Sequence, residues 1–200
     1  MAKRIIAFFA GGIGNRYLTA AILAVIPVTE IKGSILYAVA SGTNAFLSFL
    51  AAYASSLLLC LSLSYLSAWA VKRIERSPRL KKATAFLLEG QTRRAEKFRY
   101  AEKGEEAREK RMLAVFLFVA LPLPMTGVWA GSILAAMLGL GRKESFFALA
   151  TGNFTAGGIV LAVAIIAGER AGLVLDLFLL LSLFLVLLAF LRKKFSHKYT

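Results

Sequence analysis

The chain contains very little cysteine and histidine, with one of each among 200 residues, Cys60 and His197. A single cysteine cannot form a disulfide within the chain, and it cannot build a cysteine metal site. The sequence also contains no nucleotide-binding loop, no nucleophile triad and no cluster of metal ligands. We therefore expect a protein that is not an enzyme and that needs no cofactor.

Charged residues are missing from long stretches of the chain. Residues 45–71 and 146–167 contain none, and residues 171–191 contain only Asp176. The first stretch is long enough for more than about 30 Å of helix, the thickness of the hydrocarbon core of a bilayer. With 58% apolar residues and a mean hydropathy of +0.69, the composition is too apolar for a soluble domain of this size. We predict an all-α, polytopic membrane protein in a single domain, residues 1–200, with these three stretches as full spans.

The net charge of +14 is concentrated beside the apolar stretches. Residues 72–111 hold fourteen Lys and Arg against seven Glu, and the tail adds four Lys and Arg within residues 192–198. Basic segments beside spans are typical of the cytoplasmic side, so we expect a protein of the cell inner (plasma) membrane with segment 72–111 and the tail in the cytoplasm. This placement favours anionic lipid headgroups over nucleic acid as partners. Segment 72–111 is predicted to form amphipathic helices at the membrane surface, with a solvated charged hairpin as the alternative.

Two further apolar segments are interrupted, residues 17–44 at PVTEIKG and residues 112–140 at PLPMTG. Their flanks are only about nine to thirteen residues long, or about 13–20 Å of helix, which is too short to span a bilayer. Each interrupted segment is followed by a full span, so the order of parts is duplicated, with a first repeat in residues 1–71 and a second in residues 112–167.

The placement of charge predicts how these segments enter the membrane. If the basic loop and the tail are both cytoplasmic, segment 112–140 begins and ends on that side and forms a re-entrant hairpin. By symmetry, segment 17–44 dips in from outside, giving inverted repeats of the kind found in secondary transporters. Lys3, Arg4 and Arg16 favour instead an internal N-terminus, and segment 17–44 would then be a single broken crossing.

Glu30 is the strongest candidate for a functional side chain. An acidic residue within the hydrocarbon costs about 2.5–3.5 kcal/mol on insertion scales and usually faces a cavity or a partner. It lies between Pro27 and Gly33, two residues before Lys32, and broken backbone at membrane depth is tolerated only where protein or water satisfies it. Burial disfavours the ionised form of a carboxyl. Glu30 is therefore predicted to bind and release protons, as the proton carrier of a transporter. The alternative is a solvated loop at the membrane surface.

The second interruption combines Pro122, Pro124, Thr126 and Gly127. The prolines cannot donate backbone hydrogen bonds and disfavour helix in the residues before them. Thr126 is placed to cap a new half-helix that begins near Val128. The free N–H groups and the positive dipole end of such a helix would suit an anion such as a phosphate. A simple proline kink is the alternative.

Three other residues are candidates for contacts with a substrate. Arg16 and Arg108 could attract a phosphate headgroup, although anchoring at the membrane surface would explain both. Asn153, in TGNFTAGG, is placed to face the protein interior among glycines that allow close helix contact, where packing is the alternative role.

Both interruptions resemble motifs of one family. IPVTEIKGSI (26–35) is similar to a Pro-x-x-Glu-x-Arg/Lys-Gly element, and LPLPMTGVWAGSILAAMLGL (121–140) to a Pro-x-Pro-Gly-Thr-Gly-x-Trp element, of the small multidrug export proteins, relatives of the DedA/VTT (SNARE-associated-like) membrane proteins. The resemblance covers about residues 5–167. Met125 stands in place of the usual glycine, and Lys32 stands where arginine is common.

The resemblance implies two re-entrant hairpins that meet at a central site, and transport coupled to protons or another ion. In the wider DedA/VTT group this includes movement of undecaprenyl phosphate or phospholipids. Glu30 would be the membrane-embedded acid and Lys32 its neighbouring cation. The turn of the second hairpin would comprise Pro122, Pro124, Thr126 and Gly127.

Three functions are compatible with these observations. The leading hypothesis is a proton-linked flippase or translocase of an anionic, lipid-linked phosphate. The second is efflux of small cationic drugs, with Glu30 binding the cation directly. The third is a non-transporting membrane scaffold that recruits partners through segment 72–111. Spans rich in small residues are also compatible with a homo-oligomer, in the simplest case a homodimer.

Overall fold

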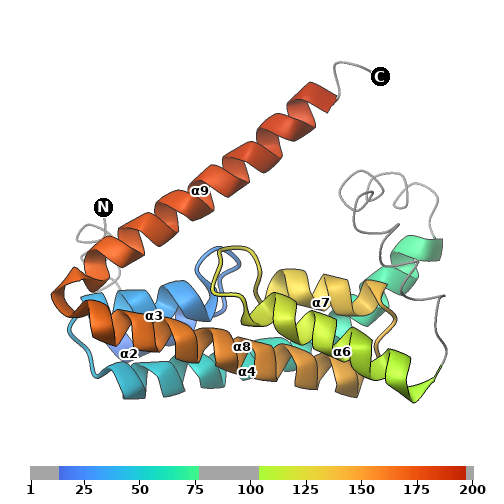
Figure 1. The fold of residues 1–200 in the computed structure, drawn as a ribbon, viewed down its shortest axis with the longest axis horizontal. Helices are drawn as coiled ribbons and strands as arrows, with labels where there is room; N and C mark the ends of the chain where they lie inside the picture. The colour runs from blue at the N-terminus through green and yellow to red at the C-terminus, as the bar shows by residue number, and fades with distance from the viewer. Residues whose placement is uncertain (1–13, 77–103, 197–200) are drawn as a thin grey trace. The chain divides into compact units, whose positions relative to one another are not determined.

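The computed structural model describes residues 14–76 and 104–196, and every regular element in these ranges is helical (Figure 1). The all-α prediction is thereby confirmed. Most of the predicted surface segment, residues 77–103, lies outside the described residues. The helices are α2 (Arg16–Leu23), α3 (Glu30–Ala40), α4 (Ala45–Arg76), α6 (Glu105–Ala120), α7 (Val128–Met137), α8 (Arg142–Ala167) and α9 (Ala171–Ser196), with the short 3-10 helix η1 (Gly168–Arg170) between the last two.

Both predicted interruptions are real breaks between helices. The second lies where the sequence predicts it, since α6 ends at Ala120 and α7 begins at Val128. The first lies slightly earlier than predicted, because α2 ends at Leu23 and α3 already begins at Glu30. Glu30, and with it Lys32, therefore belongs to a helix and not to the loop.

The helices extend further than the uncharged stretches. α4 continues to Arg76, α6 begins at Glu105, α8 begins at Arg142 and α9 continues to Ser196. Charged residues are good helix formers and can pair along the helix surface, as Glu106 and Lys110 do at 3.1 Å. The uncharged stretches therefore mark only the part of each helix that is suited to lipid. They do not mark the ends of the helices, which lie further along the chain.

The chain divides into two compact units, and the division falls inside α4, after Tyr53, and inside α8, after Ala156. Among the described residues, unit 1 comprises 14–53 and 157–196, and unit 2 comprises 54–76 and 104–156.

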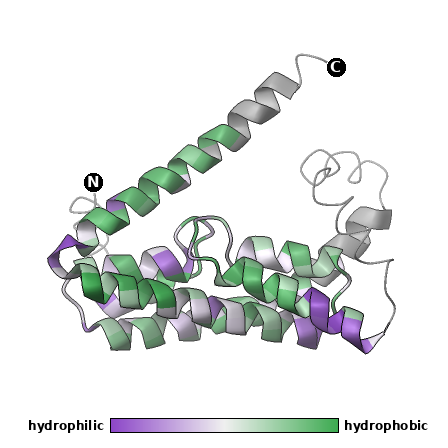
Figure 2. Ribbon diagram, viewed as in Figure 1, coloured by the Kyte–Doolittle hydropathy of each residue, from purple (hydrophilic) through white to green (hydrophobic). Residues whose placement is uncertain are grey.

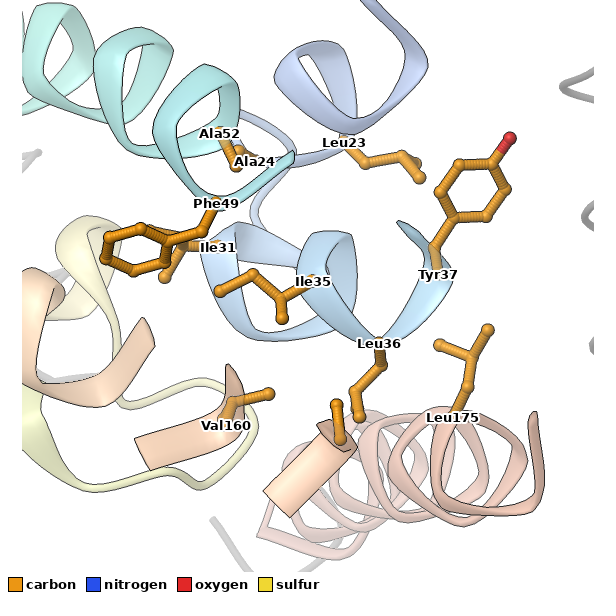
Figure 3. Packing of buried hydrophobic residues seen from close by; sticks show 11 residues of the cluster. Leu23, Ala24, Ile31, Ile35, Leu36, Tyr37, Phe49, Ala52, Val160 and Leu175 are labelled. Carbon is orange, nitrogen blue, oxygen red and sulfur yellow. The ribbon is translucent and has the colours of Figure 1, made fainter. Parts of the chain in front are cut away.

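Unit 1 is built around α3, which is buried along almost its whole length. Ile31, Ile35 and Leu36 of α3 pack in one apolar cluster with residues of α2, α4, α8 and α9 (Figure 3). Glycine allows these close approaches, since a Cβ at Gly157 would lie 2.9 Å from Ile31 Cδ1. A largely buried helix of only 11 residues is thus held by neighbours on several sides.

Unit 2 has its own apolar cluster, formed by α4, α6, α7 and the first half of α8. Val119 of α6 and Leu149 of α8 both pack where a Cβ at Gly131 of α7 would stand. A Cβ at Gly152 would lie 2.8 Å from the carbonyl oxygen of Phe116. These glycines allow close helix contact, as expected for Gly152 from the sequence.

The apolar helices keep most of their side chains exposed. Two described stretches are long and apolar enough to cross a membrane, Ala45–Leu66 and the 44-residue stretch Arg142–Leu185. Only 33% and 22% of their most apolar windows are buried, whereas a core helix of a soluble protein is mostly buried. Figure 2 shows apolar colour along these helices and hydrophilic colour at the first turns of α6.

The longer stretch has enough length for two crossings. At 1.5 Å per residue it measures about 66 Å, roughly twice the hydrocarbon thickness. The chain changes direction at η1, between α8 and α9 (Figure 1), where Gly168 has a φ of 51°. The lengths therefore accommodate the three predicted spans.

Candidate functional site

Each unit contains a helical hairpin with a Pro-x-Thr turn. In unit 1, the hydroxyl of Thr29 donates to the carbonyl oxygen of Leu23, the last residue of α2, at 2.5 Å. In unit 2, the hydroxyl of Thr126 lies 2.9 Å from the carbonyl oxygens of both Leu121 and Leu123. Each threonine thus satisfies carbonyls left without a helical partner at the break.

The expected role of Thr126 as a cap for α7 is wrong. The N-cap residue of α7 is Gly127, and no side chain caps this end of the helix. The helix does begin at Val128, as predicted. The turn directs the Thr126 hydroxyl back towards α6, where the prolines have left carbonyl groups to satisfy.

The open end of each hairpin is closed by an arginine. Arg16 Nη1, at the start of α2, donates to the carbonyl oxygen of Ser41 at the end of α3, at 2.6 Å. Arg111 Nη1 of α6 donates to the carbonyl oxygen of Leu138 at the end of α7, at 3.2 Å. The end of the second helix therefore lies beside the start of α2 in unit 1, and beside the seventh residue of α6 in unit 2. Segment 17–44 is a hairpin and not a single broken rod.

The second helix of each hairpin ends in the same backbone motif. Gly42 after α3 and Gly139 after α7 have φ values of 72° and 71°. The following residues close the turn, since Thr43 N donates to Ala38 O at 3.2 Å and Leu140 N donates to Ala135 O at 3.0 Å. This is the Schellman arrangement, which needs a left-handed residue and therefore favours glycine.

A short repeat in the sequence matches this duplication of the hairpins. The order of interrupted segments and spans does not reveal it. Pro27-Val28-Thr29 precedes the tetrapeptide GSIL (33–36), and Pro124-Met125-Thr126 precedes a second GSIL (131–134). Three residues separate the threonine from the tetrapeptide in the first copy and four in the second. The two hairpins are thus related in sequence as well as in geometry.

The charged residues are confined to the first copy of this element, at Glu30 and Lys32. Glu30 Oε2 lies 3.7 Å from Lys32 Nζ, and the two side chains are 4% and 0% exposed. Glu30 Oε1 is buried and has no hydrogen-bond partner among the described residues. The pair is therefore enclosed in unit 1 and is not the solvated loop considered from the sequence.

The backbone is strained at both turns. Glu30 has a φ of 49° and Met125 a φ of 65°, and they are the only non-glycine residues with positive φ in the described parts of the chain. The left-handed backbone at Glu30 lets its side chain reach Lys32, two positions further on. Such strain persists only where surrounding structure enforces it, and it is common at functional sites.

The remaining candidates differ in placement. At the first turn Pro27 is exposed and Gly33 is buried, while at the second Pro122 is exposed and Pro124 and Gly127 are buried. Asn153 is fully buried in α8.

Arg16 and Arg108 do not lie at the turns. Arg16 is at the opposite end of α2, about 12 Å along the helix from the break, beside an open cavity of about 490 Å³. Arg108 pairs with Glu105 at 3.0 Å and with Glu144 at 3.7 Å, near the start of α6. The sequence did not distinguish Arg108 from Arg111, which closes the hairpin.

Comparison with known proteins gives one assignment. No curated protein and no solved structure matches the chain. Residues 30–159 match the model of the family described as "Putative small multi-drug export protein". The match covers more than half of the chain. It begins at Glu30, the first residue of α3, and ends within α8, so it includes both α3 and α7. The apolar, largely exposed helices agree with a membrane protein that serves in transport or export, and the chain belongs to this family.

Proposed function

We propose that this protein is a proton-linked transporter that moves an anionic, lipid-linked phosphate across the membrane. The observation that carries the proposal is the buried Glu30–Lys32 pair, in which Glu30 Oε1 is left without a partner among the described residues. Two buried charges with incomplete hydrogen bonding cost stability, since desolvation can exceed their attraction. Such a costly pair would be useful in a transporter in which Lys32 exchanges the Glu30 carboxylate for the substrate.

Competition for one ammonium group supplies the coupling. While Glu30 is ionised, its carboxylate neutralises Lys32 at 3.7 Å. A proton on Glu30 removes that neutralising charge, and a phosphate beside Lys32 then becomes favourable. When Glu30 loses the proton, its carboxylate attracts Lys32 again and the phosphate is released. Proton and anion would therefore move in the same direction.

The hairpins fit this proposal as re-entrant elements. α3 and α7 have 11 and 10 residues, too short to cross a bilayer. The N-terminus of α7 has no side-chain cap, so its N–H groups suit an anion. We include in the proposal three full spans, inverted repeats, a cytoplasmic position of segment 72–111 and the tail, and kinship with the DedA/VTT proteins.

The test is transport in reconstituted vesicles with an imposed pH gradient. Glu30→Gln should abolish the pH-dependent movement of a polyprenyl or long-chain alkyl phosphate, because the amide cannot release a proton. Unchanged transport in this variant would remove Glu30 from the mechanism.

A double variant separates function from folding. Glu30→Gln removes the carboxylate charge that neutralises the buried Lys32 ammonium, and breaking a buried ion pair costs about 3–5 kcal/mol. Glu30→Gln/Lys32→Met removes both charges, so it should recover most of the stability in detergent while transport stays absent. Recovery of transport together with stability would show that the pair is only structural.

Export of small cations is the second candidate, favoured by the family description and by Glu30 Oε1, an acceptor with no hydrogen-bond partner among the described residues. In that case the substrate would replace Lys32 beside the carboxylate. The two candidates predict opposite substrate charge. Parallel assays with dodecyl phosphate and dodecyl trimethylammonium should therefore show transport of only one of them.

A further inference from the structure

Asn153 is an unexplained polar residue in the middle of α8. Its side chain is 0% exposed, and neither Oδ1 nor Nδ2 has a hydrogen-bond partner among the described residues. It lies about 16 Å along the helix from Arg142, near the middle of 26 residues. If α8 spans the membrane, this position is close to the bilayer midplane.

The surroundings on α8 give the amide no structural role. Leu149 and Ala156, one turn before and after it, are fully buried and apolar. The nearby hydroxyls of Thr151 and Thr155 donate to the carbonyl oxygens of Phe147 and Thr151 at 2.7 and 3.0 Å. The two threonines nearest to Asn153 are thus satisfied by carbonyl oxygens of their own helix, whereas Asn153 has no such partner among the described residues. A buried amide without hydrogen bonds is costly, and an apolar residue would pack without that cost.

We infer that Asn153 contacts the substrate and takes a protonated oxyacid group, such as a singly protonated phosphate monoester. Nδ2 donates to the oxo or anionic oxygen of this group, and Oδ1 accepts the hydrogen bond of its O–H. A primary amide matches a group that offers an acceptor beside a donor. A quaternary ammonium offers neither. The inference names the substrate chemistry of the proposed transporter and in that respect rests on the proposed function.

The first measurement is thermal unfolding of purified Asn153→Ala in detergent. Because the substitution removes an unsatisfied buried amide, the variant should unfold at the same temperature as the wild type or at a higher one. Asn44→Ala provides the contrast, since Asn44 Oδ1 accepts from Leu47 N at 3.0 Å at the start of α4, and its loss should lower the unfolding temperature. A decrease for Asn153→Ala as large as that for Asn44→Ala would overturn the inference.

The second measurement is stabilisation of the same proteins by ligands. Dodecyl phosphate should raise the unfolding temperature of the wild type, whereas its methyl diester and dodecyl trimethylammonium should not. Loss of two hydrogen bonds should weaken the apparent affinity of Asn153→Ala for dodecyl phosphate about tenfold or more. Thr155→Ala, two positions along the same helix, should bind like the wild type.

Different failures have different meanings. Equal dodecyl phosphate binding by Asn153→Ala and the wild type, or no stabilisation of the wild type by dodecyl phosphate, would overturn the role of Asn153. Binding that depends on Asn153, with no transport of the phosphate by wild-type vesicles, would support the site and contradict the proposed transport function.

Discussion

Met125 occupies a backbone conformation that normally requires glycine. Its φ of 65° is in the left-handed region, where a Cβ crowds the following carbonyl and costs about 1–2 kcal/mol. Resembling motifs have glycine at this position, and the geometry of the turn explains why. The Met125 side chain is 42% exposed, so its packing can offset only part of this cost.

Replacement of Met125 by glycine should therefore stabilise the protein. The backbone strain is relieved, while the greater freedom of glycine in the unfolded chain offsets part of the gain. We expect a net increase of up to about 1 kcal/mol, seen as a higher unfolding temperature in detergent. Met125→Ala retains the Cβ and serves as the control. If alanine and glycine stabilise equally, the cause lies in the methionine side chain and not in the backbone.

Residue types indicated the site better than they indicated its geometry. The acid beside Pro27 and Gly33 marked Glu30 correctly as unusual, because charge within an apolar segment is costly wherever it lies. The pairing with Lys32 depends on one left-handed φ at Glu30, which propensity does not predict for a glutamate.

At the scale of elements, each helical hairpin has hydrogen bonds that close both of its ends. The turn end is closed by a threonine hydroxyl and the open end by an arginine. The prolines made both breaks predictable from the sequence. The arginine contacts were not predictable, since Arg111 and Leu138 are 27 positions apart and meet only after α6 and α7 have folded together.

Loss of the closing arginine should loosen the second hairpin. Arg111 bonds Leu138 O at 3.2 Å and Ala107 O of its own helix at 2.9 Å. Hydrogen bonds from a charged donor contribute about 1.5–3 kcal/mol each, so Arg111→Gln should lower the free energy of unfolding by roughly this amount. Amide exchange at residues 138–140 should also accelerate.

A neighbouring cation provides the control for this prediction. Lys110 is 49% exposed and pairs along the helix surface with Glu106, at 3.1 Å. Such pairs contribute about 0.3–0.5 kcal/mol, and Lys110→Gln should barely change stability. Similar losses in the two variants would mean that overall charge, and not closure of the hairpin, determines the effect.

At the scale of the whole molecule, charge and hydropathy are separated along the chain. The net charge of +14 coexists with helices whose apolar windows are mostly exposed. An aqueous solvent would not tolerate that much exposed apolar surface, whereas lipid would. In the proposed arrangement the basic residues lie at the membrane surface, on the cytoplasmic side.

Cysteine labelling in intact and opened cells tests this arrangement. The native Cys60 is fully buried, so the wild type should not react with a membrane-impermeant maleimide. Lys110→Cys, at an exposed basic position, should react only after the membrane is opened, because the proposed arrangement places it on the cytoplasmic side. Leu177→Cys, 67% exposed in α9, should react from neither side, since a thiol in hydrocarbon cannot form the reactive thiolate.

Labelling of Lys110→Cys in intact cells would reverse the proposed orientation. Labelling of Leu177→Cys without detergent would show that the exposed face of α9 meets water, and the argument from its apolar surface would then fail.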